Sequence, residues 1–178
     1  MKPKIFIIGA GGHGKVVLDA IQLANSYEVL GFVDSAVPIG TLVLNDIKVV
    51  ASQDNISSLK NKAEYFIVAI GNNKLRRELS SLAKTNFKYA TIIHPSAIIG
   101  SGVKIGQGSV VLSNVVINAS STIGENVIVN AGVIIDHDSK IGNNIHLSIG
   151  TKVGSNSIIA DEVTTSIGQN IDSFSKIN

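Results

Sequence analysis

From Ile93 onward, every sixth residue of the chain is aliphatic, a period that matches neither an α-helix nor an ordinary β-strand. Fourteen of the fifteen positions in this series are aliphatic, and the exception is Thr165. A second series, four residues later in each hexad, holds small or narrow side chains except at Ile145 and Gln169. This repeat predicts an all-β parallel β-helix, a triangular prism in which both series point inward and residues eighteen apart stack. Thr165 predicts looser packing in its coil.

The first ninety residues lack this repeat and are expected to form a separate domain. Residues 4–8 are apolar enough for a buried strand, a glycine-rich turn follows at 9–14, and an apolar-periodic helix is expected from Lys15 to about Ala24. Further strands are expected at 29–33, 47–50 and 65–70, and a helix at about 74–84. The sequence therefore predicts a small Rossmann-like, mostly parallel α/β sheet in residues 1–90 and a β-helix in residues 91–178.

Composition excludes several classes of protein. There is no Cys, so disulfides, thiolate metal sites and an acyl-cysteine intermediate are ruled out. No apolar run has the roughly eighteen residues that a membrane span needs, and we expect a soluble, cytoplasmic protein. Residues 1–92 hold 11 basic and 7 acidic groups (+4), whereas residues 93–178 hold 4 and 6 (−2). A modestly basic first domain suits a phosphate-bearing ligand, but no basic and aromatic stripe indicates nucleic-acid binding.

The glycine-rich turn predicts a ligand site in the first domain. Gly9, Gly11 and Gly14 match a dinucleotide fingerprint, and Asp34 lies twenty residues after the last of them. Ninety residues hold little more than one mononucleotide-binding half, so a nucleotide-sugar is the better match in size. Ligands of open parallel sheets bind beyond the carboxyl ends of the strands. The expected binding residues are Gly11, Gly12, His13, Gly14, Asp34, Gly71 and Asn72. The alternative is that these segments are only tight turns.

On the prism, the one compact titratable group is Asp136-His137-Asp138. An imidazole accepts a proton near neutral pH, and an adjacent carboxylate can orient it, so His137 is the best candidate for a general base. His146 lies half a coil later and is expected on the next face, where it could meet His137 across an interface between neighbouring prisms. The alternative for both is an exposed corner residue. We assign no role to His94, and the spacing of histidines and aspartates predicts no metal site.

Several motifs together resemble one known family. They are Gly11-Gly12-His13-Gly14-Lys15, Ala69-Ile70-Gly71-Asn72-Asn73 with Arg76 following, Ile93-His94-Pro95, and Asn130 followed by Asp136-His137-Asp138. This combination resembles the bacterial hexapeptide-repeat sugar acetyltransferases of the NeuD/PglD type, over nearly the whole chain. The resemblance implies a left-handed β-helix, a homotrimer, and acetyl-CoA bound between adjacent prisms.

The resemblance also implies roles for individual residues. By analogy, His137 is the base, Asp138 assists it, and Asn130 lies near the acceptor. The residues implied to contact acetyl-CoA are His146, Ser155 and Ile167. Those implied to contact the nucleotide-sugar are Gly12, His13, Gly14, Asp34 and Gly71. Compared with the family, the second domain is expected to be truncated at its carboxyl end, which would leave part of the acetyl-CoA site missing.

The leading hypothesis is therefore direct, acetyl-CoA-dependent transfer to the amino group of a UDP-linked 4-amino-4,6-dideoxy sugar in bacterial glycan biosynthesis. The nearest alternative is O-acetylation of a sialic acid. A further hypothesis, from a different class of protein, is a catalytically impaired nucleotide-sugar-binding or scaffold protein. A dinucleotide-dependent oxidoreductase is disfavoured, because no residue set for hydride transfer accompanies the fingerprint.

Overall fold

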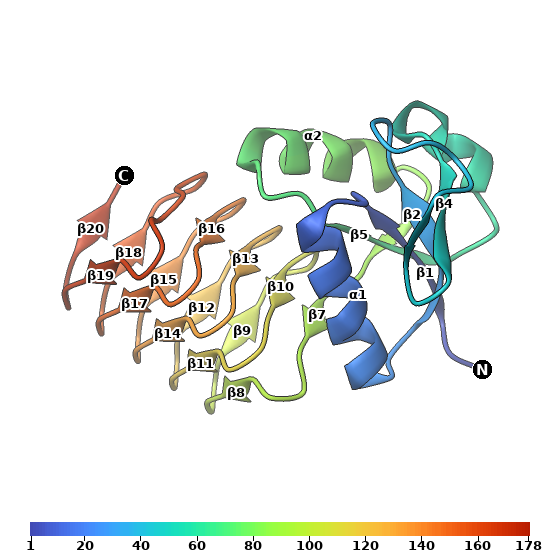
Figure 1. Ribbon diagram of the computed structural model, residues 1–178. Coiled ribbons are helices and arrows are strands. Elements are labelled where there is room, and N and C mark those ends of the chain that lie inside the picture. The colour runs from blue at the N-terminus through green and yellow to red at the C-terminus, as the bar shows by residue number, and fades with distance from the viewer.

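A computed structural model describes residues 1–178 and shows an α/β unit packed against a prism of stacked strands (Figure 1). The six-stranded sheet of the α/β unit has the order β3-β4-β2-β1-β5-β6. Its strands are β1 (Lys4–Ile8), β2 (Glu28–Val33), β3 (Leu42–Leu44), β4 (Ile47–Ala51), β5 (Tyr65–Val68) and β6 (Lys88–Tyr89). All neighbours are parallel except β3 and β4, so the sheet is mixed at one edge. The short edge strands β3 and β6 were not predicted, because two or three residues carry no periodic signal.

Two α-helices accompany the sheet, α1 (Gly12–Ala24) and α2 (Asn73–Ala83), with a 3₁₀ helix η1 (Gln53–Leu59) between them in the chain. The expected start of α1 at Lys15 was wrong by three residues. The helix begins within the glycine turn, where Gly11 is the extended N-cap residue and its carbonyl accepts from Lys15 N (3.2 Å). His13 therefore lies in the first helical turn. None of the helices combines the length and apolar character that crossing a bilayer requires.

The prism is the predicted left-handed parallel β-helix, and its strands form three parallel sheets. Their orders are β16-β13-β10-β7, β19-β17-β14-β11-β8 and β20-β18-β15-β12-β9. The strands are β7 (Ile92–Ile93), β8 (Ile98–Ile99), β9 (Lys104–Ile105), β10 (Val110–Val111), β11 (Val116–Ile117), β12 (Thr122–Ile123), β13 (Ile128–Val129), β14 (Ile134–Ile135), β15 (Lys140–Ile141), β16 (His146–Leu147), β17 (Lys152–Val153), β18 (Ile158–Ile159), β19 (Asn170–Ile171) and β20 (Lys176–Ile177).

The register of the prism confirms the stacking predicted from the repeat. Val110 pairs with Ile128, and Val116 pairs with Ile134, each eighteen residues further along the chain. Both inward series fill one continuous interior, and Ile145, which breaks the narrow series, is fully buried there. At the first coil Ile93 keeps 38% of its surface exposed, because no earlier coil covers it.

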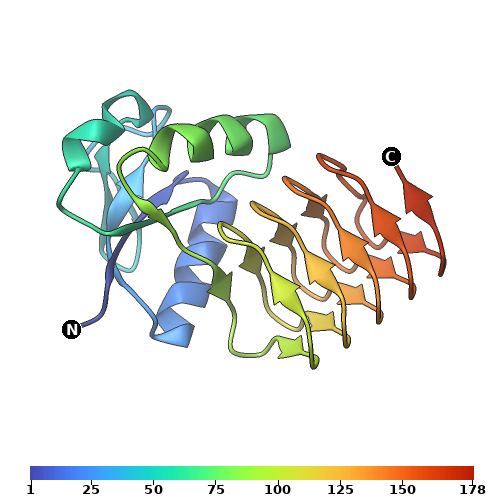
Figure 2. The same ribbon diagram turned by 180° about the vertical axis from the view of Figure 1, so that it is seen from behind.

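The prism presents one sheet to the α/β unit. Helix α1 lies against β7 and β10, and its apolar side chains share a core with the outward side chains of that sheet (Figures 1 and 2). Val17, Leu18 and Ile21 of α1 are fully buried, and Ile92 and Val110 of the prism are 1% exposed. The two units therefore share an apolar junction, which fixes how the carboxyl ends of β1, β2 and β5 lie against the prism.

The Thr165 hydroxyl is hydrogen-bonded inside the prism, while looser packing of its coil stays a prediction. Thr165 is 4% exposed, its Oγ1 accepts from Ser148 N (2.8 Å), and Oγ1 also hydrogen-bonds Thr151 Oγ1 (2.8 Å). The local irregularity is confined to its neighbour Thr164, which forms an isolated bridge to His146 in place of a strand.

We expect Thr165→Val to destabilise the protein, although valine restores the aliphatic series. The change leaves the half-buried Ser148 N without its acceptor and removes one of the hydrogen bonds of Thr151 Oγ1, which keeps Ser148 O as a partner; the loss costs about 1–3 kcal/mol. Urea unfolding of the two proteins measures the difference, with Ile171→Val as a control that shortens a neighbouring buried side chain without removing a hydrogen bond. A more stable Thr165→Val protein would contradict this account.

Candidate functional site

Residues from four distant segments meet where the α/β unit contacts the prism. His146 on β16 places Nδ1 3.3 Å from Gly71 O and Nε2 3.3 Å from Asn130 Nδ2. The ring of His13, from the first turn of α1, lies 6.4 Å from the His146 ring between centroids, tilted by 32°. We call His13, Gly71, Asn130 and His146 the interdomain cluster. The sequence placed His146 on a separate face but did not show that this face meets the glycine-rich turn.

Both histidines of the interdomain cluster are held in the neutral form. Burial lowers the pKa of His13 to about 4, and His146 and Arg76 lower it further by charge repulsion. Burial, then the Arg76 charge, also lowers the pKa of His146. The Nε2 atom of His13 is buried and has no hydrogen-bond partner. A buried polar atom without a partner is costly, so this atom is a candidate contact for a polar ligand.

The glycine-rich turn divides into an exposed part and a buried part. Gly11 and Gly12 are exposed, and a Cβ at either position would meet nothing within 4 Å. Gly14 is buried, and a Cβ there would lie 2.1 Å from Gly9 O. Close backbone packing therefore explains glycine at 14, whereas nothing in the fold requires glycine at 11 or 12. Backbone approach to a ligand is the remaining reason for those two glycines.

Asp34 and Asn72 both have backbone partners. The Asp34 carboxylate accepts from Ala10 N (2.7 Å), Ala36 N (2.7 Å) and Val37 N (3.2 Å), so it joins the end of β2 to the glycine-rich turn. Asn72 is the N-cap of α2, where its Oδ1 accepts from Leu75 N (2.9 Å). These contacts give each residue a structural role: Asp34 follows β2 and holds the glycine-rich turn, and Asn72 follows Gly71 of the interdomain cluster and caps α2.

A second group lies at the prism corner between β14 and β15. His137 Nδ1 is 2.8 Å from Asp138 Oδ2, and the two side chains are about half exposed, at 52% and 54%. The hydrogen bond to Asp138 is the main reason that the pKa of His137 is raised, and the charges of Asp136 and Asp138 add to it. Since Asp138 holds Nδ1, the free Nε2 is the nitrogen able to take a proton from a substrate.

The corner backbone is itself anchored. Asp136 Oδ1 accepts from His137 N (2.8 Å) and from Asn118 Nδ2 (2.9 Å), and both bonds lower the pKa of Asp136. Inside the prism, the buried Ser121 hydroxyl donates to Asp136 O (2.8 Å). His137 is therefore carried on a fixed corner rather than on a mobile loop, which suits a group that must meet a substrate at a defined position.

The structure does not bring all the predicted residues together within one chain. His137 and the interdomain cluster lie on different sheets of the prism, and no hydrogen bond or ring contact joins them. Ser155 lies one coil beyond His137, where Asn156 N donates to His137 O (3.0 Å). Ile167 lies at the edge of the β14 sheet that is opposite the His137 corner, and its side chain is 78% exposed.

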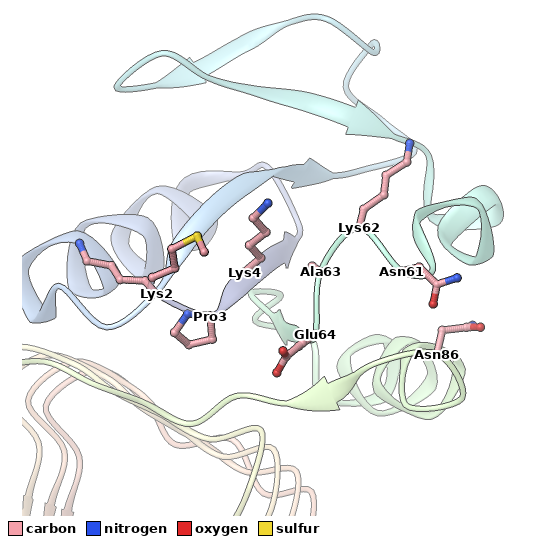
Figure 3. Close-up of a pocket in the computed structure, with 9 residues that line it drawn as sticks. Lys2, Pro3, Lys4, Asn61, Lys62, Ala63, Glu64 and Asn86 are labelled. Carbon is pink, nitrogen blue, oxygen red and sulfur yellow. The ribbon is translucent and has the colours of Figure 1, made fainter.

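The two hollows of the surface lie elsewhere. The larger, of about 650 Å³, lies at the amino ends of β1 and β5, where Lys2, Lys4, Lys62 and Glu64 line it (Figure 3). The smaller, of about 410 Å³, lies between α2 and the prism, and Tyr89 and Asp161 are among its lining residues. Neither contains a residue of the interdomain cluster or the His137–Asp138 pair. No group of three or more His, Cys, Asp or Glu residues is arranged to hold a metal ion.

Arg76 was quoted in a sequence motif but given no role, and the structure places it at the centre of the junction. It is 1% exposed, and its guanidinium donates to carbonyls on both units, including Gly71 O (3.1 Å) and Ile145 O (3.0 Å). Burial lowers its pKa to about 10, so it remains charged at neutral pH. Nothing in a helix with several charged residues marks one of them as buried, which is why sequence reasoning missed it.

Comparison with known proteins identifies relatives of both units. Residues 4–82 match the family model of the PglD N-terminal domain. A UDP-N-acetylbacillosamine N-acetyltransferase from Bacillus subtilis (strain 168) is 31% identical over 114 residues, which are 61% of this chain and 51% of that protein. The match thus spans about half the length of this curated relative.

Two solved structures match almost the entire chain. The acetyltransferase domain of PglB from Neisseria gonorrhoeae, in complex with acetyl coenzyme A, is 30% identical with a TM-score of 0.78, and the match covers 99% of this chain and 96% of that one. A mutant of perosamine N-acetyltransferase from Caulobacter crescentus, in complex with CoA and GDP-perosamine, is 28% identical with a TM-score of 0.78, over 98% and 88% of the two chains.

Proposed function

The chain belongs to the PglD/NeuD-type family of hexapeptide-repeat sugar acetyltransferases, and from this premise we propose that it transfers the acetyl group of acetyl-CoA to an amino sugar carried by a nucleotide. The observation that carries the proposal is the His137–Asp138 pair on its anchored corner, with Nδ1 bound at 2.8 Å and Nε2 free. The relatives support the reaction class, since one is described with acetyl coenzyme A and another with CoA and GDP-perosamine. We further propose that the reaction takes place in the cytoplasm.

The proposed chemistry is direct transfer in a ternary complex. The sugar amine attacks the thioester carbonyl, His137 Nε2 takes a proton from the attacking nitrogen, and Asp138 stabilises the imidazolium. The new C–N bond forms, the C–S bond breaks, and the proton passes to the departing thiolate of CoA. Asn130 and His146 would contact the substrates. Ser155 and Ile167 would line the cofactor groove. The nucleotide-sugar would be held by the glycine-rich turn, Gly11 to Gly14 with His13, and by Asp34, Gly71 and Asn72.

We infer that the site is shared between protomers of a homotrimer. His137 and the interdomain cluster lie on different sheets, so a second prism is needed to bring them to one substrate. The outer face of the sheet that contains β8 and β14 is apolar in its first coils, where Ile98 and Ile134 are 64% and 39% exposed, and polar further along at Lys152 and Asn170; Ile167 lies at the edge of this sheet. An exposed apolar stripe of this kind suits contact with another prism, and cyclic symmetry would close three of them.

Complementation tests the shared site. Chains carrying His137→Ala and chains carrying His146→Ala, unfolded together and refolded as a mixture, should regain part of the activity that each lacks alone. Sedimentation equilibrium should give three times the chain mass of 18.6 kDa. A monomer by sedimentation, or mixed trimers without activity, would show that the site is not shared.

The reaction itself is tested by thiol release from acetyl-CoA. Three acceptors are offered separately: a UDP-linked 4-amino-4,6-dideoxy sugar, GDP-perosamine, and free sialic acid. Release with either nucleotide-sugar, and a product heavier by one acetyl group, is the expected result. Release with sialic acid alone would replace N-acetylation by O-acetylation. Tight nucleotide-sugar binding with no release from any acceptor would favour a binding or scaffold protein.

The His137–Asp138 hydrogen bond also predicts a pH effect. His137 must be neutral to accept a proton, and its raised pKa puts the acid limb of kcat above the ordinary imidazole value of 6.5. In Asp138→Asn the bond no longer stabilises the charged ring, so the acid limb should move to lower pH while kcat on the plateau falls. A pH–rate profile of both proteins measures this, with Asp161→Asn as a control on another corner. An acid limb at the same pH in both proteins would show that Asp138 does not affect the pKa of the base.

A further inference from the structure

Arg76 is a buried cation without a carboxylate partner. Its five N–H groups donate to five acceptors, namely Asn126 O (2.9 Å), Ile70 O (3.0 Å), Gly71 O (3.1 Å), Asn73 Oδ1 (2.8 Å) and Ile145 O (3.0 Å). Three acceptors belong to the loop and helix start after β5, and two belong to the prism. Burying an unpaired charge is costly, and well-packed apolar residues can join two surfaces without that cost. Domain joining alone therefore does not account for an arginine here.

One of these acceptors is shared with the interdomain cluster. Gly71 O accepts from Arg76 Nη1 (3.1 Å) and lies 3.3 Å from His146 Nδ1. A carbonyl oxygen can only accept, so the His146 nitrogen that faces it must carry the proton. Arg76 fixes the position of this carbonyl and so fixes which nitrogen of His146 is protonated.

The other side of the ring leads to the same tautomer. Asn130 Oδ1 accepts from Ala131 N (2.8 Å), so the amide group that faces His146 Nε2 at 3.3 Å is the NH₂ group. Since NH₂ donates, Nε2 must accept. The contacts on the two sides of the ring thus specify one state of His146, neutral with the proton on Nδ1.

We propose that Arg76 is a positioning residue of the acetyltransferase site, which holds His146 in the Nδ1–H tautomer through the shared Gly71 carbonyl and so makes His146 Nε2 a hydrogen-bond acceptor. This inference rests on the proposed function. In this tautomer the single lone pair of His146 Nε2 faces the Asn130 amide at 3.3 Å, and a substrate N–H, such as that of a pantetheine amide or the sugar amine, would replace that amide as the donor. The second N–H of the Asn130 amide is then the neighbouring donor available to the thioester carbonyl oxygen.

The charge of Arg76 favours the same neutral form of His146 that the hydrogen bonds specify. The titratable or charged groups that face His146 are His13 from α1 and Arg76 from α2, and no carboxylate contacts the ring. Burial first, and then the nearby cation, disfavours a second proton on either histidine, and the pKa of each is lowered. The pKa of His146 is thus lowered while that of His137 is raised, so His146 loses its second proton at a lower pH than His137 does.

The tautomer can be measured directly. The chain has four histidines, so ¹⁵N-histidine labelling of the full-length protein gives a simple spectrum that is assigned by single His→Gln variants. In the wild-type protein, Nδ1 of His146 should resonate as a protonated nitrogen and Nε2 as an unprotonated one. Arg76→Lys keeps the charge but loses the planar fork of five donors, and should give a mixture of tautomers with a kcat/KM lower by about 10²-fold.

Arg77→Lys is the matched control. Arg77 is the next residue of α2 and also crosses the junction, to Glu162, but this ion pair is about half exposed. Its replacement should leave both the spectrum of His146 and the activity unchanged. If Arg76→Lys does not fold, Asn73→Ser is the second variant, because it removes one of the five acceptors of Arg76. It should also give a mixture of His146 tautomers, with a smaller fraction protonated on Nε2.

Three results would overturn the inference. They are a wild-type His146 protonated on Nε2, a doubly protonated His146 at neutral pH, or folded Arg76→Lys and Asn73→Ser proteins with the wild-type tautomer. These spectra need no turnover. A wild-type protein that acetylates none of the acceptors would refute the proposed function, while the tautomer measurement would still decide whether Arg76 positions His146.

Discussion

Replacing His137 with alanine should lower kcat by about 10²- to 10⁴-fold and leave the affinity for the nucleotide-sugar unchanged. The reason is geometric: the side chain lies on an exposed corner, contacts only Asp138 within the chain, and supports no packing. Its loss removes the proposed proton acceptor without disturbing the packing of the prism. Initial rates of thiol release and calorimetric titration with the nucleotide-sugar measure the two quantities separately.

His94→Gln is the control for this experiment. His94 hydrogen-bonds Ser96 within its own turn (Nδ1 to Oγ, 2.8 Å) and lies apart from both groups of candidate residues, so its replacement should leave kcat unchanged. A His137→Ala protein with wild-type kcat would show that another group accepts the proton. A variant that lost both turnover and ligand affinity would indicate that the prism corner binds substrate rather than acting as a base.

Gly14→Ala should be among the most destabilising single-methyl changes in the chain. The new Cβ would lie 2.1 Å from Gly9 O, which is a backbone atom of the same tight turn, and 3.3 Å from the buried Phe32 ring. The Gly9 carbonyl cannot move away without opening the contact between β1 and α1, so we expect the free energy of unfolding to fall by about 3 kcal/mol. Urea unfolding at equilibrium gives the change from the midpoint and slope.

Gly12→Ala separates packing from ligand binding in the same turn. A Cβ at Gly12 meets nothing within 4 Å, so the free energy of unfolding should change by no more than about 0.5 kcal/mol. Any loss of nucleotide-sugar affinity in this variant then reports on ligand contact and not on folding. Equal stability of the Gly12→Ala and Gly14→Ala proteins would refute the packing role given to Gly14.

Much of the fold could be predicted because its determinants are local. Each coil of the prism repeats the same two inward positions, so the aliphatic and narrow series specify strand, corner and stacking register. The pairing of Val110 with Ile128 follows directly from that repeat. His137 and Asp138 are adjacent in sequence on a corner, and their 2.8 Å hydrogen bond also depends on local geometry. The start of α1 was missed, because a run of glycines carries no helical periodicity.

The sequence by itself determined the β-helix, the α/β unit before it and the hydrogen-bonded His137–Asp138 pair at the corner, because periodic or adjacent residues specify each of them. Only the tertiary structure decided that His146 meets Gly71, 75 residues away, and that Arg76 is buried between carbonyls of both units, with Ile145 69 residues away. These contacts depend on how the apolar face of α1 docks on β7 and β10. That docking brings together residues whose own sequence neighbours carry no signal of the encounter, and it sets the tautomer of His146.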